Sequence, residues 1–579
     1  MKIILRNFLF FCLSFTLAAQ SPLGTVTGLA VDPGLSAVPN ATVKLRSIDT
    51  GVERELTTNA TGAYTFPNLA PGRYKLSASA SGFRSLETQE FVVAAYRTVR
   101  QDLRFELAAN VTEVTVTGGI SAVVQTESPS ISASLSSKQI LELPTNLRSV
   151  FNNAGDSGLI FSMMPLTIPG VVQVGAGAAW LVPGSGANGV RLKVDGIETN
   201  FGNFGGPDPV SQPSFESVDE FTANVNSNRA EFGGIGNITT VTKAGSNQFH
   251  ATGFWYIRNS ALDARNAFQA AKPFQNIHNY GANLSGPLKK DKTFFHANFD
   301  GTSGSRAYLF NSNVPTLAQR EGDFTGAAVV RNPLNNQPFE GNRIPASMIT
   351  SQARRAQELF YPVPNFGPPT LAAGNYRATF NGPETHRIYE VRLDHNFSNT
   401  QSAFVRYQHK THDYKIPGAR SPLPPTSVGT STNLRNVHFL TFGHIASIRP
   451  TLFNEFRAGN VVLSSKSDAN VKGQPLLEQI GIRGLPARPG INGVPTIGVA
   501  GLSTVQQILL NPVNDGHYQI SDNLTWTKGR HTVKGGFEFV HWYVNRYMPV
   551  DAASFGNFNF SSRFSNNAYG DFLLGLPTS

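Results

Sequence analysis

The chain has 579 residues, of which 15% are charged, and a single cysteine, Cys12. This length exceeds one ordinary core and predicts several domains, while a lone cysteine excludes a disulfide framework and a cysteine-ligated metal site. The net charge of +10 comes from lysines and arginines that are spread thinly, which indicates dispersed surface charge and argues against nucleic-acid binding.

The first 19 residues have the pattern of a secretory signal peptide. Lys2 and Arg6 precede an apolar stretch at 8–17, and small residues at 16–20 suit signal-peptidase cleavage. The stretch is about half of the ~20 residues that a membrane-spanning helix needs. Cys12 lies inside it, so the exported chain is expected to have no thiol.

Residues 20–108 are expected to form a small β-sandwich of short alternating strands. Turn sequences such as Asp32-Pro33-Gly34 separate the strands, as in sandwich domains. The expected strands cover 25–31, 41–47, 53–57, 63–66, 73–80 and 98–105.

Within this segment, residues 37–43, 58–66 and 69–74 resemble the carboxypeptidase-regulatory-like domain, one of the carbohydrate-binding-like folds. The resemblance implies an accessory domain without catalytic residues. The aromatic residues Tyr64, Phe66 and Tyr74 alternate along strands, which favours a place in the core over a ligand-binding role.

Residues 109–119 form a linker with a β-branched strip at 111–118. Such a strip can pair with the sheet edge of a partner, and it resembles a TonB box. The resemblance implies contacts with a TonB-type energy-transducing protein of the inner membrane. The candidate contact residues are Thr112, Glu113, Val114, Thr115 and Val116. A plain linker or edge strand is the alternative.

Residues 120–245 are rich in Gly, Asn and Pro and resemble the plug domain of TonB-dependent receptors. A strand at 190–198 contains an Asp-Gly turn, and the segments 230–234 and 238–247 match the end of a plug and the entry into a barrel. A plug in a wide barrel must be held by polar contacts that can be rearranged. The candidate plug motif is Asp195, Gly196, Glu231, Phe232 and Gly233. For Asp195 and Glu198, ordinary turn and strand-end roles are the alternative.

From residue 246 to 579, outward apolar and inward polar residues alternate. Since no apolar run after the leader approaches 18 residues, a membrane-embedded structure must be a β-barrel, although a soluble sandwich would alternate too. One set of alternating positions is Tyr389, Val391, Leu393 and Phe397 against Glu390, Arg392, Asp394 and Asn396; the second is Tyr518, Ile520, Leu524 and Trp526 against Gln519, Ser521, Asn523 and Thr525; the third is Thr293, Phe295, Ala297 and Phe299 against His296, Asn298 and Asp300.

The segments 283–295, 319–324, 341–345 and 570–577 resemble Oar-like TonB-dependent transporters, in the same relative order. The resemblance implies a mainly β protein: a β-sandwich, an α+β plug domain, then part of an antiparallel outer-membrane β-barrel. It places the chain in the cell outer membrane, with sandwich and linker in the periplasm. The implied partners are the TonB-type protein, outer-membrane lipid, the barrel-assembly machinery and an unidentified extracellular ligand; no cofactor is implied.

The barrel segment offers only about ten strand candidates, whereas TonB-dependent barrels have roughly 22. The chain also ends in Pro577-Thr578-Ser579 instead of the terminal aromatic of such barrels. We therefore expect residues 246–579 to be the first part of the barrel of a longer product.

Two patterns suggest other chemistry and are set aside. Residues 155–158 read Gly-Asp-Ser-Gly, as around a serine-protease nucleophile, but no matching histidine segment is found, which favours a turn. His409 and His412 lie three residues apart. On a strand followed by a loop, their side chains would not converge on one metal ion, so we expect them to be solvated loop residues.

The order of the domains and the resemblance to TonB-dependent transporters imply a non-enzymatic receptor that takes up a large ligand in an energised step, with the plug as the gate. A surface adhesion or assembly protein that uses the barrel as an anchor is the alternative. A soluble periplasmic carbohydrate-binding protein is a third. The ligand class, whether peptide, oligosaccharide or metal chelate, stays open.

Overall fold

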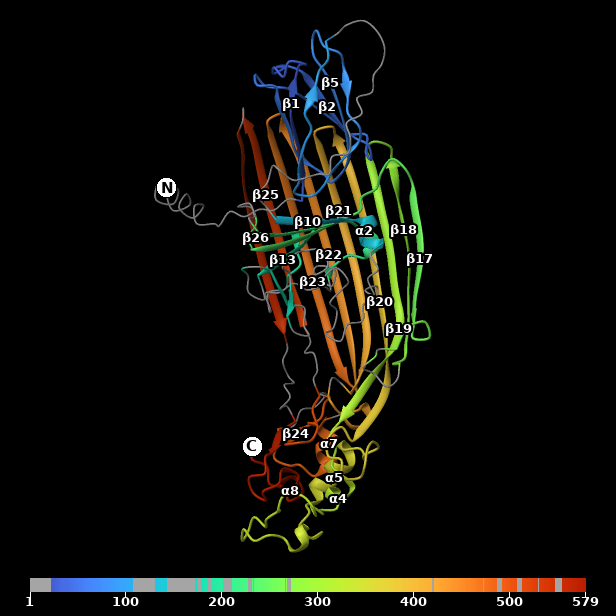
Figure 1. Cartoon of the computed structure of the whole chain (residues 1–579), viewed down its shortest axis with the longest axis vertical. Helices are drawn as coiled ribbons and strands as arrows, with labels where there is room; N and C mark the ends of the chain where they lie inside the picture. Colours follow the sequence, from blue (N-terminus) through green and yellow to red (C-terminus); the bar gives the residue numbers. More distant parts are fainter. Residues whose placement is uncertain are drawn as a thin grey trace, which may run out of the picture.

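The computed structural model contains three β-rich bodies and a lobe at the far end of the longest sheet (Figure 1). It describes residues 22–107, 131–142, 172–174, 179–182, 184, 189–200, 211–226, 232, 234–265, 267, 272–418, 421–471, 473–486, 492–507, 513–528, 531–546 and 555–579. The expected signal peptide and the linker at 109–119 lie outside these ranges. Among the described residues, no helix has the length and apolar character needed to cross a bilayer.

The N-terminal body is the expected two-sheet sandwich. One sheet has the order β4-β1-β8, with β9 also on β1, and the other has the order β3-β2-β5-β6, with β7 also on β5. Tyr64, Phe66 and Tyr74 lie in its buried core, as predicted. The strands are β1 (Gly24–Val31), β2 (Thr42–Ser47), β3 (Glu53–Thr57), β4 (Ala63–Leu69), β5 (Gly72–Ser79), β6 (Leu86–Glu87), β7 (Phe91–Val93), β8 (Thr98–Arg100) and β9 (Leu103–Arg104).

The second body is the plug, a five-stranded sheet of order β10-β15-β16-β13-β14 that crosses in front of the long strands (Figure 1). Its elements are β10 (Ile131–Ser136), α2 (Ser137–Glu142), β13 (Val190–Val194), β14 (Ile197–Glu198), the 3-10 helix η3 (Phe215–Ser217), β15 (Val218–Asn226) and β16 (Gly236–Thr242); β11 (Val172–Val174) and β12 (Ala179–Leu181) pair separately. Every residue of β16 is buried, because the strand is covered on both faces.

The third body is a nine-stranded antiparallel sheet, close to the roughly ten strands expected. Neighbouring strands follow chain order, and within the described residues β17 and β26 each pair on one side only. The strands are β17 (His250–Asn259), β18 (Gln275–Lys289), β19 (Thr293–Ser312), β20 (Tyr376–Ser398), β21 (Gln401–Pro417), β22 (Thr430–Arg449), β23 (Leu452–Ala469), β25 (Val513–Lys528) and β26 (His531–Arg546).

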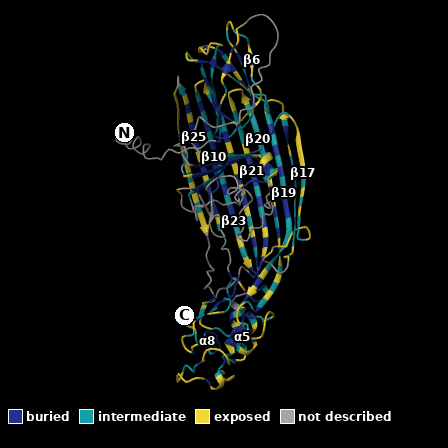
Figure 2. Cartoon of the chain, in the orientation of Figure 1, coloured by how far each residue is buried: buried dark blue, intermediate teal, exposed yellow. Residues whose placement is uncertain are grey.

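Alternation along these strands agrees with the sequence prediction (Figure 2). Tyr389 and Val391 point outward and are 45% and 49% exposed, whereas Glu390 between them is 3% exposed. On β25, Ile520 and Leu524 are exposed while Gln519 is buried. An apolar outer face with a polar inner face is the arrangement of a membrane barrel.

The two ends of this sheet differ. At one end, tight connections join β18 to β19, β20 to β21, β22 to β23 and β25 to β26; we call it the short-turn end, and the sandwich sits there. At the other, the long-loop end, the connections run 260–274, 313–375, 418–429 and 470–512, and the last three contribute to the lobe.

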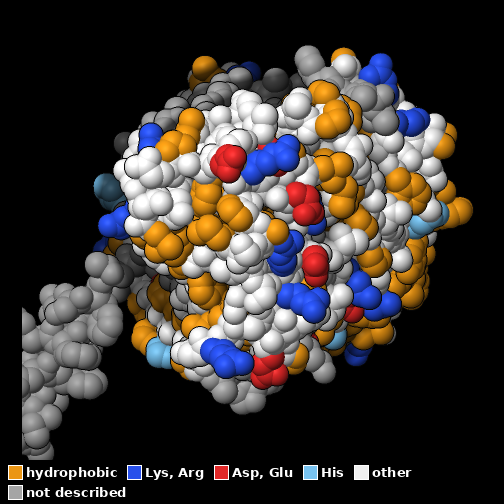
Figure 3. Space-filling view, turned by 90° about the horizontal axis from the view of Figure 1, so that it is seen from below, with side chains coloured by type: hydrophobic (Ala, Val, Ile, Leu, Met, Phe, Trp, Pro, Cys, Tyr) orange, Lys and Arg blue, Asp and Glu red, His pale blue; other side chains and the backbone are white. Residues whose placement is uncertain are grey.

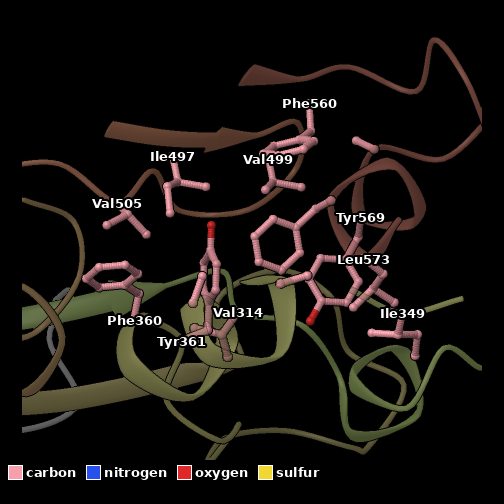
Figure 4. Packing of buried hydrophobic residues seen from close by; sticks show 14 of the residues in the cluster. Val314, Ile349, Phe360, Tyr361, Ile497, Val499, Val505, Phe560, Tyr569 and Leu573 are labelled. Atoms are coloured by element: carbon pink, nitrogen blue, oxygen red, sulfur yellow. The ribbon is translucent and has the colours of Figure 1, made fainter. Parts of the chain in front are cut away.

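The long connections and the residues after β26 fold together into a lobe with its own apolar core, which the sequence did not indicate. Phe360 and Tyr361 face Ile497 and Val505 across this core (Figure 4). From below, the lobe end of the molecule shows basic and acidic side chains mixed with apolar ones (Figure 3). The lobe contains α4 (Leu317–Arg320), η4 (Glu340–Asn342), α5 (Ser351–Phe360), α6 (Pro425–Val428), α7 (Gly473–Ile480), α8 (Ala568–Leu573) and the parallel pair β24 (Thr496–Val499) and β27 (Asn557–Phe560).

Three of the segments that carried the family resemblance meet in this lobe. Asn342 donates from Nδ2 to the Phe324 carbonyl at 2.6 Å and accepts from the Val330 amide at 2.7 Å. Near α8, the Leu573 carbonyl accepts from the amide of Thr350. The resemblance at 319–324, 341–345 and 570–577 therefore marks one packed unit.

Candidate functional site

The plug motif begins with a two-residue hairpin turn between β13 and β14. Asp195 and Gly196 have φ angles of 49° and 87°, the left-handed pair of a type I′ turn, for which Asp-Gly is a preferred sequence. A Cβ on Gly196 would lie 2.7 Å from Cδ of Arg457. Glycine is therefore required both by the backbone and by the approach of the barrel wall.

The Asp195 carboxylate is buried, with 2% of the residue exposed. It accepts hydrogen bonds from the Thr242 amide at 3.0 Å and the Thr242 hydroxyl at 2.7 Å. Arg392 Nη1 and Arg406 Nε of the barrel wall lie 3.5 and 3.8 Å from its oxygens. The turn thus places a negative charge between two strands of the wall.

Each arginine around the turn also has a carboxylate partner on the wall. Arg392 pairs with Asp394 at 2.8 Å, Arg406 with Glu390 at 2.6 Å, and Arg457 with Glu455 at 2.6 Å. Arg457 also donates from Nη1 to the Asp195 carbonyl. Because buried charges are tolerated only when paired, plug and wall complete one charge network.

A second set of polar contacts lies beside the turn. Lys193 reaches Glu538 of β26 at 2.5 Å, and Glu198 pairs with Arg191 at 2.7 Å. Gln519 accepts from the Glu198 amide at 2.7 Å and donates to the Gly196 carbonyl at 3.1 Å. Burial raises the pKa of Glu198, although Arg191 and Lys193 oppose this shift.

The turn is also held by one apolar contact. Val194 and Ile197, on either side of Asp195-Gly196, pack against Val437, Phe439, Val461 and Leu463 of β22 and β23. A Cβ on Gly459 would lie 2.6 Å from Ile197, so the glycine at this wall position allows the plug to pack close to the strand. The contact is dry and small compared with the polar network around it.

Polar contacts of this kind suit a removable plug. A hydrogen bond to a charged group contributes about 1.5–3 kcal/mol net, because water can replace either partner. Without the plug, the wall arginines would keep Asp394, Glu390 and Glu455 as partners. The contact with Asp195 can therefore open without leaving these three arginines unpaired.

The sandwich contacts the plug through the turn that follows β7. The Ala95 amide donates to Glu220 Oε2 at 2.8 Å. The Tyr96 ring lies 5.2 Å from the Phe232 ring, and its hydroxyl lies 3.3 Å from Thr239 Oγ1. Burial raises the pKa of Glu220, and the hydrogen bond from Ala95 opposes the shift.

The structure brings only part of the predicted site together. Asp195 and Gly196 lie at the plug–wall contact, and Phe232 lies instead at the contact with the sandwich. Glu231, Gly233 and the strip from Thr112 to Val116 lie outside the described residues.

Sequence reasoning missed the partners of the plug on the barrel wall. Of these, Arg392 stood among the inward positions but received no role, and Arg406 and Arg457 were not singled out. Charged residues at inward positions of alternating strands were the available signal.

The expectation for His409 and His412 was wrong in one respect. Both lie within β21, not in a solvated loop, and they point to opposite faces of the sheet. His412 is buried beside Glu384 at 2.5 Å, whereas His409 stacks outward on His438 with ring centres 4.6 Å apart. They do not converge, as expected, and the described residues contain no group of three His, Cys, Asp or Glu side chains placed to hold a metal ion. The Gly-Asp-Ser-Gly segment at 155–158 lies outside the described residues.

Two family models match the chain. The model described as "Outer membrane beta barrel domain" matches residues 241–579, more than half of the chain. The model described as "Carboxypeptidase regulatory-like domain" matches residues 25–107, the sandwich. Both matches agree with the bodies seen in the structure.

A curated protein, the TonB-dependent transporter Oar of Myxococcus xanthus, is 27% identical over 297 residues, which are 49% of this chain and 27% of that protein. The chain thus spans about a quarter of the length of this relative.

Solved structures with partial similarity include the siderophore receptor PirA of Acinetobacter baumannii, at 12% identity over 68% of this chain and 48% of that one, with a TM-score of 0.33. A variant of the ferric enterobactin receptor PfeA of Pseudomonas aeruginosa is 10% identical over 72% of this chain and 49% of that one, with a TM-score of 0.40.

Proposed function

Because this chain belongs to the outer membrane beta barrel domain family, we propose that it acts as a TonB-dependent receptor that takes up a large ligand in an energised step. Its place is the cell outer membrane. The plug is the gate in this proposal, and the ligand class stays open among peptides, oligosaccharides and metal chelates. No catalytic role is proposed for any residue.

One observation carries the proposal: the plug turn is held to the barrel wall by a charge network that can open. The Asp195 carboxylate approaches Arg392 and Arg406 on the inner face of the sheet. Each of these arginines also forms an ion pair with a carboxylate of the barrel wall. A purely structural core would be held by apolar packing, which is costly to separate. Rearrangeable polar contacts instead suit a domain that must move.

The two ends of the sheet support an orientation. Outer-membrane barrels have short periplasmic turns and longer extracellular loops. By this rule the short-turn end, with the sandwich, faces the periplasm, and the lobe at the long-loop end faces the exterior. Energy would then arrive on the sandwich side, and the ligand would arrive on the lobe side.

The proposed energy input is the linker between sandwich and plug. A TonB-type protein of the inner membrane would pair with Thr112, Glu113, Val114, Thr115 and Val116 as an added strand. Pulling on this strip would load the plug, whose first described strand, β10, pairs with β15.

The test is a deletion of residues 111–117 in the full-length protein. We expect uptake of labelled solutes that bind the purified protein to be lost, while binding itself is retained. The control deletes the short exposed turn at residues 33–36 of the sandwich, between β1 and β2. Unchanged uptake in the 111–117 deletion would refute the energised mechanism.

The second candidate function is that of a surface adhesion or assembly protein, and the lobe is the observation that favours it. Its separate core gives the long-loop end a rigid face, which a binding module needs as much as a receptor does. Adhesion predicts binding to cells or matrix that a protonophore does not change. Protonophore-sensitive accumulation of solute predicts the receptor.

A further inference from the structure

A cavity of about 790 Å³ lies where the sandwich, the plug and the short-turn end of the barrel meet. All three bodies contribute polar or charged walls to it. They include Asp49 and Arg54 from the sandwich, Asp219 and Lys243 from the plug region, and Arg392 and Asp394 from the barrel. We call this cavity the exit chamber, because it lies on the sandwich side of the Asp195 turn.

The chamber has a mixed lining. Charged groups of both signs lie among apolar side chains such as Leu45, Phe294 and Phe404. The charged groups keep their hydration when the chamber holds water or a polar solute. A ligand that passes here therefore meets both polar and apolar groups.

The sandwich covers the chamber and is attached at the barrel rim by few contacts. The Asn247 amide donates to the Asp49 carbonyl at 3.0 Å. The Arg54 guanidinium lies 4.8 Å from the centre of the Phe453 ring. Small, polar contacts between domains of one chain usually permit relative motion.

The second attachment is to the plug, through Ala95 and Tyr96. The Ala95 residue is fully buried, and its amide is bound by Glu220. Tyr96 contacts Phe232 and Thr239. The cover is thus connected to the same plug sheet that carries the Asp195 turn, so movement of that sheet reaches the cover.

Size decides what the chamber can hold while the sandwich stays in place. A volume of 790 Å³ lies within the range of about 300–1,000 Å³ that holds a drug-sized molecule. We propose that the sandwich is a movable cover on the exit chamber and must leave the barrel rim before a large ligand can enter the periplasm. This inference rests on the proposed uptake function.

The experiment measures exposure of the cover contact in living cells that carry the full-length protein. Within these 579 residues Cys12 is the only cysteine and lies in the expected signal peptide. With any cysteine elsewhere in the full-length protein replaced by serine, single-cysteine variants can be labelled cleanly. The probe is a maleimide dye small enough to enter the periplasm through porins. Ala95→Cys reports the cover contact, Val194→Cys reports the plug–wall contact, and Ala78→Cys in the sandwich core is the control.

We expect energised cells to label Ala95→Cys at least about fivefold faster than protonophore-treated cells, since labelling follows the open population. Ala78→Cys stays unlabelled in both. Protonophore-sensitive labelling at Val194→Cys with a protected Ala95→Cys would overturn the cover and leave the uptake function standing. Protection at both positions would refute both proposals. Labelling of Ala78→Cys as fast as Ala95→Cys would mean unfolding of the sandwich and would also overturn the cover.

A cross-link at the rim gives an independent measurement. Asp49→Cys with Asn247→Cys joins residues whose backbones are already hydrogen-bonded, within reach of a disulfide. Brief oxidation should capture less of this pair in energised cells than after protonophore treatment. The control pair, Lys44→Cys with Glu55→Cys across β2 and β3, should be captured equally. Equal capture of the rim pair under both conditions would refute the movable cover.

Discussion

Replacing Asp195 by Asn removes the plug charge but preserves its turn. Asparagine tolerates the left-handed backbone that Asp195 adopts, with φ of 49°, so the hairpin to β14 is expected to form as before. The amide oxygen can still accept one hydrogen bond from Thr242. The substitution therefore changes two things at once: the ion pairs with Arg392 and Arg406 of the wall, and the strength of the hydrogen bonds from Thr242 within the plug.

The magnitude follows from the contacts that are lost. Two hydrogen bonds from Thr242 to an ionised carboxylate contribute about 1.5–3 kcal/mol each, and Asn retains one neutral bond at about 1 kcal/mol. Breaking a buried ion pair costs about 3–5 kcal/mol, but Arg392 keeps Asp394 and Arg406 keeps Glu390. We therefore expect a loss of about 3 kcal/mol, which is roughly 100-fold in the opening equilibrium of the turn.

Amide hydrogen exchange in detergent is the assay, because it reports local opening. Protection of the amides of β13, β14 and Thr242 should fall roughly 100-fold in Asp195→Asn, with the sandwich amides unchanged. Asp263→Asn is the matched control, because its ion pair with Arg258 is long, at 3.6 Å, half-buried and away from the plug. If protection of Thr242 in Asp195→Asn stayed within about twofold of the parent, the charge network would not hold the plug.

Three further perturbations test other contacts. Glu220→Gln weakens the acceptor of the hydrogen bond from the Ala95 amide, so it should loosen the contact between sandwich and plug and raise the labelling rate of Ala95→Cys; an unchanged rate would show that the Glu220 carboxylate does not hold the sandwich. Gly196→Ala places a Cβ 2.7 Å from Arg457 at a φ of 87° and should lower plug protection by about 1–3 kcal/mol in hydrogen exchange; wild-type protection would contradict the close approach. Asn342→Ala removes two hydrogen bonds and should destabilise the lobe by about 1–3 kcal/mol, seen as faster proteolysis there and not in the sandwich.

Local features of this protein were predictable from sequence because their causes are local. The Asp195-Gly196 pair has the backbone preference of a hairpin turn, and the structure places that turn there. Alternation at Tyr389, Glu390 and Val391 predicted which side chains face inward, since the strand repeat is two residues.

The partners of the turn were not predictable in the same way. Arg392, Arg406 and Arg457 lie some 200–260 residues further along the chain, and their approach to Asp195 depends on how the plug sits against the sheet. Sequence could indicate that polar contacts hold the plug, but it could not indicate which residues form them.

The lobe escaped prediction for another reason. Its core combines residues from three long connections and from the segment after β26, such as Phe360, Leu423, Val499 and Phe572, and none of these segments alternates strongly enough to predict packing. Family resemblance marked the segments, but the physical reason for it, a shared core, appears only in three dimensions.

Strand β16 connects the contact between plug and barrel wall with the contact between plug and sandwich. Thr239, near its middle, lies against Tyr96 of the sandwich, and Thr242, at its end, binds the Asp195 carboxylate. The two threonines are three residues apart on one fully buried strand, so they cannot shift independently without breaking its pairing with β15. A pull that releases Asp195 from the wall therefore also loads the contact with Tyr96. It follows that plug release and opening of the sandwich cover should occur as one step, and that Asp195→Asn should raise labelling at Ala95→Cys as well as exchange at Thr242.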